Sequence, residues 1–444
     1  MTNSEQPSVT ADAEELRRAV RLVASMTGKS VDFIRVTRDG GMLQLRSRDS
    51  ENDIRIHVQI GLLDHVGEFD FSYETKPLVK SLVKATGKCV LHDTSLTSNT
   101  GIHQTPSRRP GNLFAGASAF DPSVSEYICF DARDFKDSMA RAAPSGPEGV
   151  EVSSSHYYTT VAKLTFNKFG CMMVAKANTR IASQFIINGN PWTDFTNFDT
   201  PRWVRREVLE VLCDAIRKDS SLLVSAGDAY MTFCLTGDMG VTICTPYLSD
   251  PSERVDELFT EHERYDWNHI AFDGELFSGV INKAIEKADR GIHGTPVQNV
   301  GFARMGANAV CSIFRDYSTV VSCVPMLIPA TASGSEPYQF AFSGTSARSI
   351  AKATSGHTSV RVFLQHGTNY TTTMLQYGNC LLYHAGVTCI SAKLMVEKVQ
   401  AVPFTPVAKT LGKQKGPTTL GKATKAPTQD FDAMLAALKA SITQ

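Results

Sequence analysis

Two short stretches of the chain combine residue types that could do chemistry. The first, SMTGKS from Ser25 to Ser30, ends in the Gly-Lys-Ser of a phosphate-binding loop. That loop requires another glycine at the place that Val23 occupies in this chain. The stretch is therefore better explained as the end of a helix, with Gly28 as the residue that stops it.

The second stretch, HERYDWNH from His262 to His269, places two histidines near acidic residues. Their spacing is not that of H-E-x-x-H, in which both histidines face one zinc ion. The chain also has no G-x-S-x-G nucleophile elbow, and its ten cysteines are scattered without a C-x-x-C pair. The sequence therefore favours a protein that is not an enzyme, with no cofactor and no metal, whose cysteines are reduced thiols in the core.

Lysine and arginine, by contrast, recur on six segments whose apolar residues have helical spacing. Acidic residues on these segments gather near the starts, where they complement the helix dipole. The chain has 45 basic and 45 acidic residues, so cations concentrated on equivalent elements would direct an electric field at one place. Either these cations only solvate outer helix faces, or they contact the phosphate backbone of DNA without reading its sequence. The candidate DNA-binding residues are Arg17, Arg18, Arg21, Lys80, Lys84, Lys136, Arg141, Arg205, Arg206, Lys283, Lys287, Arg348 and Lys352.

The helical segments occur in an order that repeats three times along the chain. The first helix of each copy opens with an aspartate that could cap it, at Asp12, Asp131 and Asp273. Three strand-like runs follow, then a second helix, then strands again. The second helices are predicted to start at Thr75, Arg202 and Thr345. Each copy thus consists of two similar halves, each a helix with an antiparallel sheet, and the sequence predicts an α+β fold.

These repeats predict three domains, over residues 1–125, 126–262 and 263–400. Within the first, residues 91–125 are rich in Ser, Thr, Gly and Pro and indicate a long loop or insertion. Residues 401–444 begin as a Lys/Pro/Thr/Gly-rich tail. The tail ends in DFDAMLAALKASI, whose apolar residues share one helical face, so we expect a short amphipathic helix on a flexible tether.

The beginning of the chain bears on its location. MTNSEQPSVTADAEELRR lacks the basic start and the apolar run of a signal peptide. No stretch of about 18 apolar residues, the length needed to span a bilayer, occurs anywhere in the sequence. We therefore expect a cytoplasmic protein without a membrane partner.

Three copies of a two-half unit with basic helices resemble the bacterial-type DNA polymerase sliding clamp, also called the beta clamp. Two local stretches strengthen the resemblance. Members of that family carry a segment similar to A-T-D-G-H-R-L-A in the middle domain, where partner proteins insert a short peptide. In MVAKANTRIASQF this chain keeps Ala175, Arg180, Ile181 and Ala182 and departs at Lys176, Ala177, Asn178 and Thr179. The family connector V-D-G-x-F-P-D-Y is similar to VDELFTEH, which keeps Val255, Asp256 and Phe259, has Glu261 as a near match, and departs at Glu257, Thr260 and His262.

The resemblance implies a processivity factor: a ring that encircles double-stranded DNA and tethers a DNA polymerase. It implies a head-to-tail homodimer of three-domain chains, with helices around the hole and sheets outside, and a clamp loader as a further partner. It also implies a partner-peptide pocket at Asn178, Thr179, Arg180, Ile181 and Phe259. The departures at this pocket suggest a divergent clamp, for example one encoded by a phage. The alternative is a viral structural or assembly protein built from repeated sheet domains.

Overall fold

The computed structural model contains two compact units. It describes residues 6–25, 32–109, 127–142, 161–167, 170–176, 181–191, 201–218, 220–237, 239–249, 259, 268–289, 298–315, 326–334, 338–366, 371–387 and 402–404. The first unit comprises Met1–Met139, Thr160–Met173 and Ile186–Ser252. The second comprises Ala140–Thr159, Val174–Phe185 and Glu253–Gln444. The first repeat and most of the second therefore share one unit.

The six helices with described bounds occur in one repeated order, strand, helix and three strands. In the first copy the two halves are β1 Ser8–Asp12, α1 Ala13–Ser25, β2 Phe33–Asp39, β3 Met42–Asp49, β4 Ile54–Gly61, and β6 Asp70–Glu74, α2 Thr75–Leu82, β7 Lys88–His92, β8 Ser95–Ser98, β9 Gly101–Gln104. In the second they are β11 Ile128–Asp131, α3 Ala132–Ala142, β12 Val161–Asn167, β13 Gly170–Lys176, β14 Ile181–Pro191, and β15 Arg202–Arg205, α4 Arg206–Ala215, β16 Ser221–Ala226, β17 Tyr230–Thr236, β18 Gly240–Pro246.

The third copy follows the same order. Its halves are β19 Asn268–Phe272, α6 Gly274–Asp289, β20 Gln298–Met305, β21 Asn308–Arg315, β22 Met326–Pro329, and β24 Gln339–Ser343, α7 Gly344–Thr354, β25 Val360–His366, β26 Thr371–Tyr377, β27 Cys380–Val387. The short strands β5 Asp64–Val66, β10 Ser107–Arg108, β23 Thr331–Ser333 and β28 Val402–Pro403 lie outside this order. The threefold repeat predicted from the sequence is present, with one additional strand before each helix.

The three aspartates predicted as caps do cap the first helix of each copy. The backbone N–H of Glu14 donates to Asp12 at 2.9 Å, that of Arg133 to Asp131 at 2.8 Å, and that of Leu276 to Asp273 at 2.9 Å. A side-chain oxygen at this position satisfies an N–H that has no partner inside the helix. The same local chemistry therefore starts three helices in three places of the chain.

Two local predictions were wrong. Residues 202–205, predicted as the start of a helix, form strand β15, which pairs with β12 from Val161↔Arg205 to Leu164↔Arg202, so the helix begins only at Arg206. Of the two readings of the stretch after His92, a long loop or an insertion, the loop is wrong for its first part, which contains the antiparallel strands β8 and β9; residues 110–126 lie outside the described residues. Leu96 of β8 is fully buried, so this short strand places one apolar residue on the inner face of its sheet.

The last strands of several halves join neighbouring sheets. In the first unit β4 pairs antiparallel with β18, with Val58 opposite Val241 and Ile56 opposite Ile243. In the second unit the first five residues of β14 pair with β27, from Ile181↔His384 to Phe185↔Cys380. The last strands of the other two halves, β9 and β22, pair on one side with β8 and β21. The sheet that ends in β9 has the order β5-β1-β7-β8-β9.

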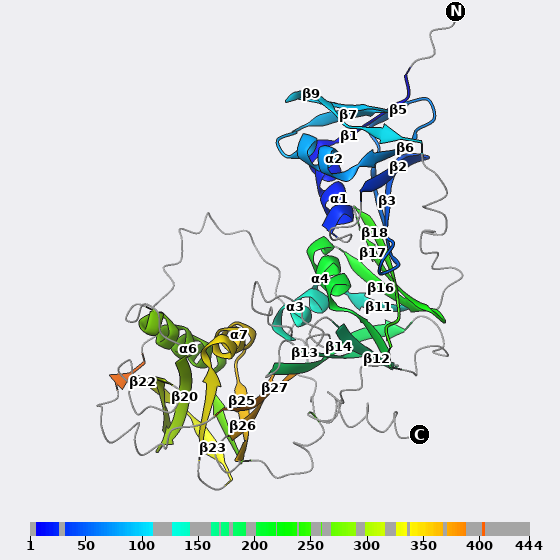
Figure 1. The fold of residues 1–444 in the computed structure, drawn as a ribbon. Coiled ribbons are helices and arrows are strands. Elements are labelled where there is room, and N and C mark those ends of the chain that lie inside the picture. The colour runs from blue at the N-terminus through cyan, green and yellow to red at the C-terminus, as the bar shows by residue number, and fades with distance from the viewer. Residues whose placement is uncertain are drawn as a thin grey trace, which may run out of the picture. The chain divides into compact units, whose positions relative to one another are not determined.

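The helices of the first unit lie along one side of its strands (Figure 1). Leu16, Val20 and Val23 of α1 are 0–1% exposed, and Leu78 and Leu82 of α2 are fully buried. Because these apolar residues face the strands, the polar residues of each helix face away from them. This arrangement positions the basic side chains.

His57 on β4 makes the junction between the first two copies sensitive to acid. The side chain is 3% exposed, and burial together with the nearby Arg46 lowers its pKa to about 4. Because the folded pKa lies below the unfolded value of about 6.5, the neutral ring is favoured in the fold and stability is lost as the pH falls from about 6.5 toward 4. We expect the protein to lose about 2 kcal/mol of unfolding free energy between pH 7.5 and pH 5 through this residue.

This expectation can be measured by urea unfolding at the two pH values. His57→Asn removes the titrating ring. The change in unfolding free energy between pH 7.5 and pH 5 should therefore be smaller in this variant than in the parent, by about 2 kcal/mol. The matched control is His103→Asn in β9, since His103 is partly exposed and bonds only locally to Thr100 among the described contacts. An equal pH dependence in the His57 variant and the parent would contradict the assignment.

Candidate nucleic-acid interface

Helix α1 carries three arginines on the side that faces away from its buried residues. Arg21 is exposed, whereas Arg17 and Arg18 are half-buried. Arg17 and Arg21 are one turn apart, so their side chains lie above each other on one helix face. The buried stripe of α1 therefore fixes the direction in which these cations project.

Two of these arginines, and one lysine of α3, bind the carbonyl ends of other helices. Arg17 Nη1 donates to the carbonyl of Ala85, just after α2, at 3.1 Å. Arg18 Nη2 donates to the carbonyl of Ala215, the last residue of α4, at 2.8 Å. Lys136 Nζ donates to the carbonyl of Ile216 at 3.4 Å. Cations at helix C-termini complement the dipole and satisfy carbonyls that lack a partner in the helix. These residues therefore hold helix ends in place, a role that the sequence did not reveal.

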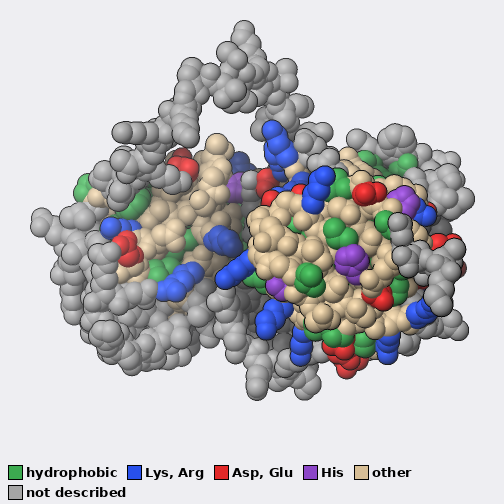
Figure 2. Space-filling view, turned by 90° about the horizontal axis from the view of Figure 1, so that it is seen from above, with side chains coloured by type: hydrophobic (Ala, Val, Ile, Leu, Met, Phe, Trp, Pro, Cys, Tyr) green, Lys and Arg blue, Asp and Glu red, His purple; other side chains and the backbone are tan. Residues whose placement is uncertain are grey.

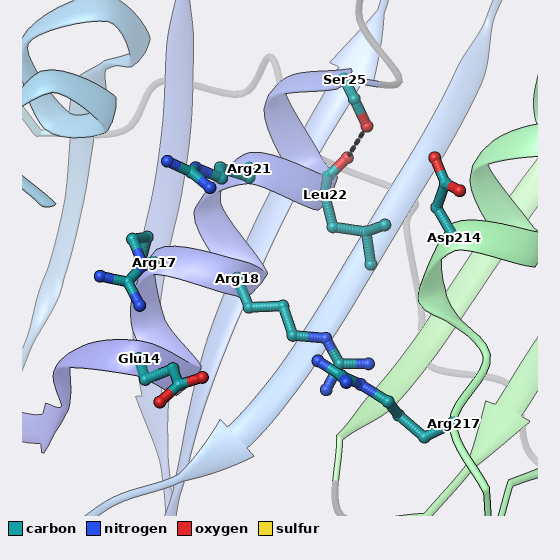
Figure 3. Close-up of a pocket in the computed structure, with 8 residues that line it drawn as sticks. All are labelled: Glu14, Arg17, Arg18, Arg21, Leu22, Ser25, Asp214 and Arg217. Carbon is teal, nitrogen blue, oxygen red and sulfur yellow. Dashed lines mark hydrogen bonds between the residues drawn. The ribbon is translucent and has the colours of Figure 1, made fainter. Parts of the chain in front are cut away.

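A shallow cavity of about 380 Å³ lies between α1 and the end of α4. Figure 3 shows Arg17, Arg18 and Arg21 projecting from α1, with Arg217 following α4. Glu14 and Asp214 are the acidic residues of the lining. Four guanidinium groups against two carboxylates leave an excess of positive charge, and guanidinium geometry suits phosphate oxygens. The cavity is thus able to accept an anion such as a backbone phosphate.

The positive bias is not uniform over the helices, contrary to the sequence interpretation. The exposed side chains of α4 are Glu207, Glu210 and Asp214. Arg205 lies in β15, before the helix, and Arg206 is 6% exposed and forms an ion pair with Glu210 at 3.0 Å. Burial therefore holds the Arg206 guanidinium within the protein. The cations associated with α4 are those at its two ends.

The remaining candidate cations fall into three groups. Lys80 and Lys84, in and just after α2, are exposed, and so are Arg348 and Lys352, one turn apart on α7. Lys283 on α6 is 37% exposed and forms an ion pair with Glu286 at 3.6 Å, which offsets its positive charge. Arg141 and Lys287 belong to α3 and α6, but their side chains lie outside the described residues. The helices α1, α2 and α7 therefore carry the clearest exposed positive charge.

The outer side of the first sheet differs from the helices. Figure 2 looks onto the part of the first unit that lies at the top of Figure 1, near β7 and β9. Lys and Arg lie near the margin of this face, and its middle carries few charges. The basic side chains visible on this face therefore lie mainly at its margin.

No protein-family model matches the sequence, and no curated protein matches it either. Solved structures do match. A DNA polymerase sliding clamp from Bacillus subtilis has a TM-score of 0.68 at 10% identity, covering 86% of this chain and 99% of that chain. A putative DNA polymerase III beta subunit from Eubacterium rectale has a TM-score of 0.67 at 10% identity, and a DNA polymerase III subunit beta from Pseudomonas aeruginosa has 0.65 at 9%, with the same coverage.

The chain has the fold of a DNA polymerase sliding clamp. The predicted α+β fold of repeated halves is thereby confirmed. At about 10% identity most side chains differ, so the likeness lies in the arrangement of the helices and strands.

The residues that the resemblance assigned to a peptide pocket are only partly described. Asn178, Thr179 and Arg180 lie outside the described residues, between β13 and β14. Ile181 is the first residue of β14 and pairs with His384 of β27, and Phe259 is 2% exposed. Residues 177–180 therefore connect β13 to β14, the two strands of the hairpin that MVAKANTRIASQF predicts.

Metal clusters, membrane-spanning helices and thiols can be considered for the part of the chain that the structure describes. There, no group of three or more His, Cys, Asp and Glu side chains could hold a metal ion, and no helix is long and apolar enough to cross a membrane. Burial raises the pKa of the Cys89 thiol to about 11 and that of the Cys213 thiol to about 12. Protonated buried thiols are poor nucleophiles and poor metal ligands.

Proposed function

We propose that this chain is a DNA polymerase processivity factor that performs no bond chemistry. Two chains would close head to tail into a ring around double-stranded DNA, and the ring would hold a polymerase near the primer end. Tethering of this kind raises the effective concentration of the polymerase at the DNA without any new contact between them. The observation that carries the proposal is the sliding-clamp fold over 86% of the chain.

The basic side chains of the helices, some exposed and some half-buried, support this proposal. Arg17, Arg18 and Arg21 on α1, Lys80 on α2 and Arg348 on α7 would face the DNA in the ring. Contacts to phosphate alone carry no sequence information, so the ring can move along DNA past small barriers. Because the arginines of α1 also hold helix ends, the charged surface is fixed in place before DNA arrives.

The partner-peptide pocket belongs to the same proposal. Asn178, Thr179, Arg180 and Ile181, with Phe259, would receive a short segment of the polymerase. Since the first two of these differ from the family pattern, the peptide that fits would also differ. The clamp loader, the cytoplasmic location and a phage origin are further parts of this proposal that rest on the family resemblance.

A ring can be tested without a loader, because linear DNA can thread through it before its ends are joined. We expect protein mixed with linear DNA and then treated with ligase to remain on the closed circles during gel filtration in high salt. Cutting the circle with a restriction enzyme should then release the protein. Equal loss from circular and linear DNA would contradict a ring and favour simple electrostatic binding or a structural role.

A further inference from the structure

The edge of the sheet that ends in β22 is covered by the segment that follows the third copy. This sheet has the order β24-β20-β21-β22-β28. Strand β28 pairs parallel with β22, with Val402 opposite Met326 and Pro403 opposite Leu327. The backbone N–H of Phe404 donates to the carbonyl of Leu327 at 2.8 Å. The pairing is only two residues long, and because the N–H of Phe404 faces β22, the nitrogen of Pro403 faces away from it.

Phe404 also contacts helix α6, next to this edge. A Cβ atom at Gly279 would lie 3.2 Å from Cζ of the Phe404 ring. Any residue larger than glycine would therefore press against the ring, so Gly279 leaves the space that the ring uses. Phe404 itself is half-buried. The segment thus attaches through the short β28–β22 pairing, the Phe404 hydrogen bond and one aromatic side chain.

The repeat indicates what else could pair with this edge. Strands β4, β14, β18 and β27 are each the last strand of a half, and they pair antiparallel with one another as β4–β18 and β14–β27. Only two halves of the repeat end in a strand without such a partner, within the described pairings: β9 of the first copy and β22 of the third. The pattern therefore matches β22 with a β9 strand.

Strand β9 has exposed apolar residues on and beside it, as expected of an edge strand that pairs with another chain. Ile102 in the middle of β9 is 71% exposed, the largest exposure among the large apolar side chains of the described residues. Val83, at the end of the neighbouring α2, is 48% exposed. Exposed apolar residues beside an open sheet edge are typical of sites where another strand adds to the sheet.

We propose that β28 is a removable cover on the β22 edge, which β9 of a second copy displaces when two chains associate. The proposal rests on the proposed ring, because it concerns the contact that would close it. An antiparallel β9 can extend the sheet more stably than the short parallel β28, and Ile102 can replace the apolar contact of Phe404. In the separate chain the cover protects the edge from uncontrolled strand pairing. Residues 402–404 would then leave the sheet as the ring closes.

Full-length Phe404→Pro tests the cover, since it removes both the N–H that bonds Leu327 and the aromatic ring. Its dimer dissociation constant, measured by analytical ultracentrifugation, is expected to be roughly tenfold lower than that of the parent, because β28 no longer competes for the edge. Pro403→Ala is the matched control: it is adjacent, keeps Phe404 and should leave the constant unchanged. Ile102→Ser, introduced into either the parent or the Phe404→Pro variant, should raise the dimer dissociation constant, because it alters β9, the strand that competes with β28.

The outcomes separate this proposal from the ring itself. Parent and Phe404→Pro chains that dimerise with equal constants would overturn the cover and leave the ring standing. Chains that stay monomeric in all variants up to about 100 μM, a weak affinity for a stable assembly, would overturn both. Tighter association of Phe404→Pro that Ile102→Ser does not weaken would overturn the assignment of β9 as the displacing strand. Hydrogen exchange at the Phe404 amide provides a direct readout, with protection expected in the monomer and lost in the dimer.

Discussion

Arg21→Glu combined with Lys80→Glu is expected to weaken DNA binding by roughly 10- to 100-fold at low salt. Both side chains are exposed, on α1 and α2, so the substitutions leave the core intact. Each phosphate contact contributes about 0.9 to the slope of log affinity against log salt, so the slope should fall by about 2. Fluorescence anisotropy with a duplex of random sequence, measured between 50 and 200 mM salt as rough limits, gives both quantities.

A control with the same change in net charge separates the helix face from a general effect. Lys88→Glu with Arg361→Glu alters two exposed cations on strands β7 and β25. If DNA lies against the helices, this pair should lower the affinity only slightly. Equal weakening by the two pairs would show that only the total charge matters, and the proposed DNA-binding face would then be wrong.

Phe302→Ala is expected to produce the largest loss of stability, about 3–5 kcal/mol. The Phe302 ring is fully buried on β20, with its centroid 5.0 Å from that of Phe340 and 5.2 Å from that of Phe277. Truncation to alanine removes the transfer free energy of the ring and leaves a cavity that its aromatic neighbours cannot fill without moving. Since Phe302 lies in the second unit, calorimetry should show a lowered transition for that unit.

Phe71→Ala provides the comparison in the first unit. Phe71 also contacts aromatic rings, with its centroid 5.0 Å from that of Phe69, but it is only half-buried on β6. Its loss should lower the free energy of unfolding by about 1–2 kcal/mol, since less apolar surface returns to water. A loss at Phe302 no greater than at Phe71 would mean that the second unit repacks around the cavity.

Local signals in the sequence were enough to predict the helices and the threefold repeat. Asp12, Asp131 and Asp273 predicted the three helix starts because a cap depends only on the next few residues. The strand before each helix was missed because it forms through distant partners. For example, Ser8 of β1 pairs with His92 of β7, on the far side of α1 and α2. Such short strands carry little periodic signal of their own.

The candidate site was predicted less completely than the fold. Helical spacing correctly placed Arg17, Arg18 and Arg21 on α1, but it could not show that two of them hold the ends of other helices. It also assigned Arg206 to the surface, because the buried end of α4 depends on how the helix meets its sheet. Charge along a helix can be read from the sequence, whereas burial of a long side chain depends on tertiary packing.

The β4–β18 pairing joins the first two copies through backbone hydrogen bonds between strands, in addition to the peptide chain that connects them. Five pairs of residues join these strands, from Gly240↔Gln59 to Cys244↔Arg55, although β4 and β18 are far apart in the sequence. In the sequence, the two copies are joined by the residues between β10 and β11. The first unit could therefore be assembled from two separate polypeptides, or from a permuted chain, with the same sheet at its centre. The border between the first two sequence repeats therefore lies inside one continuous β-sheet.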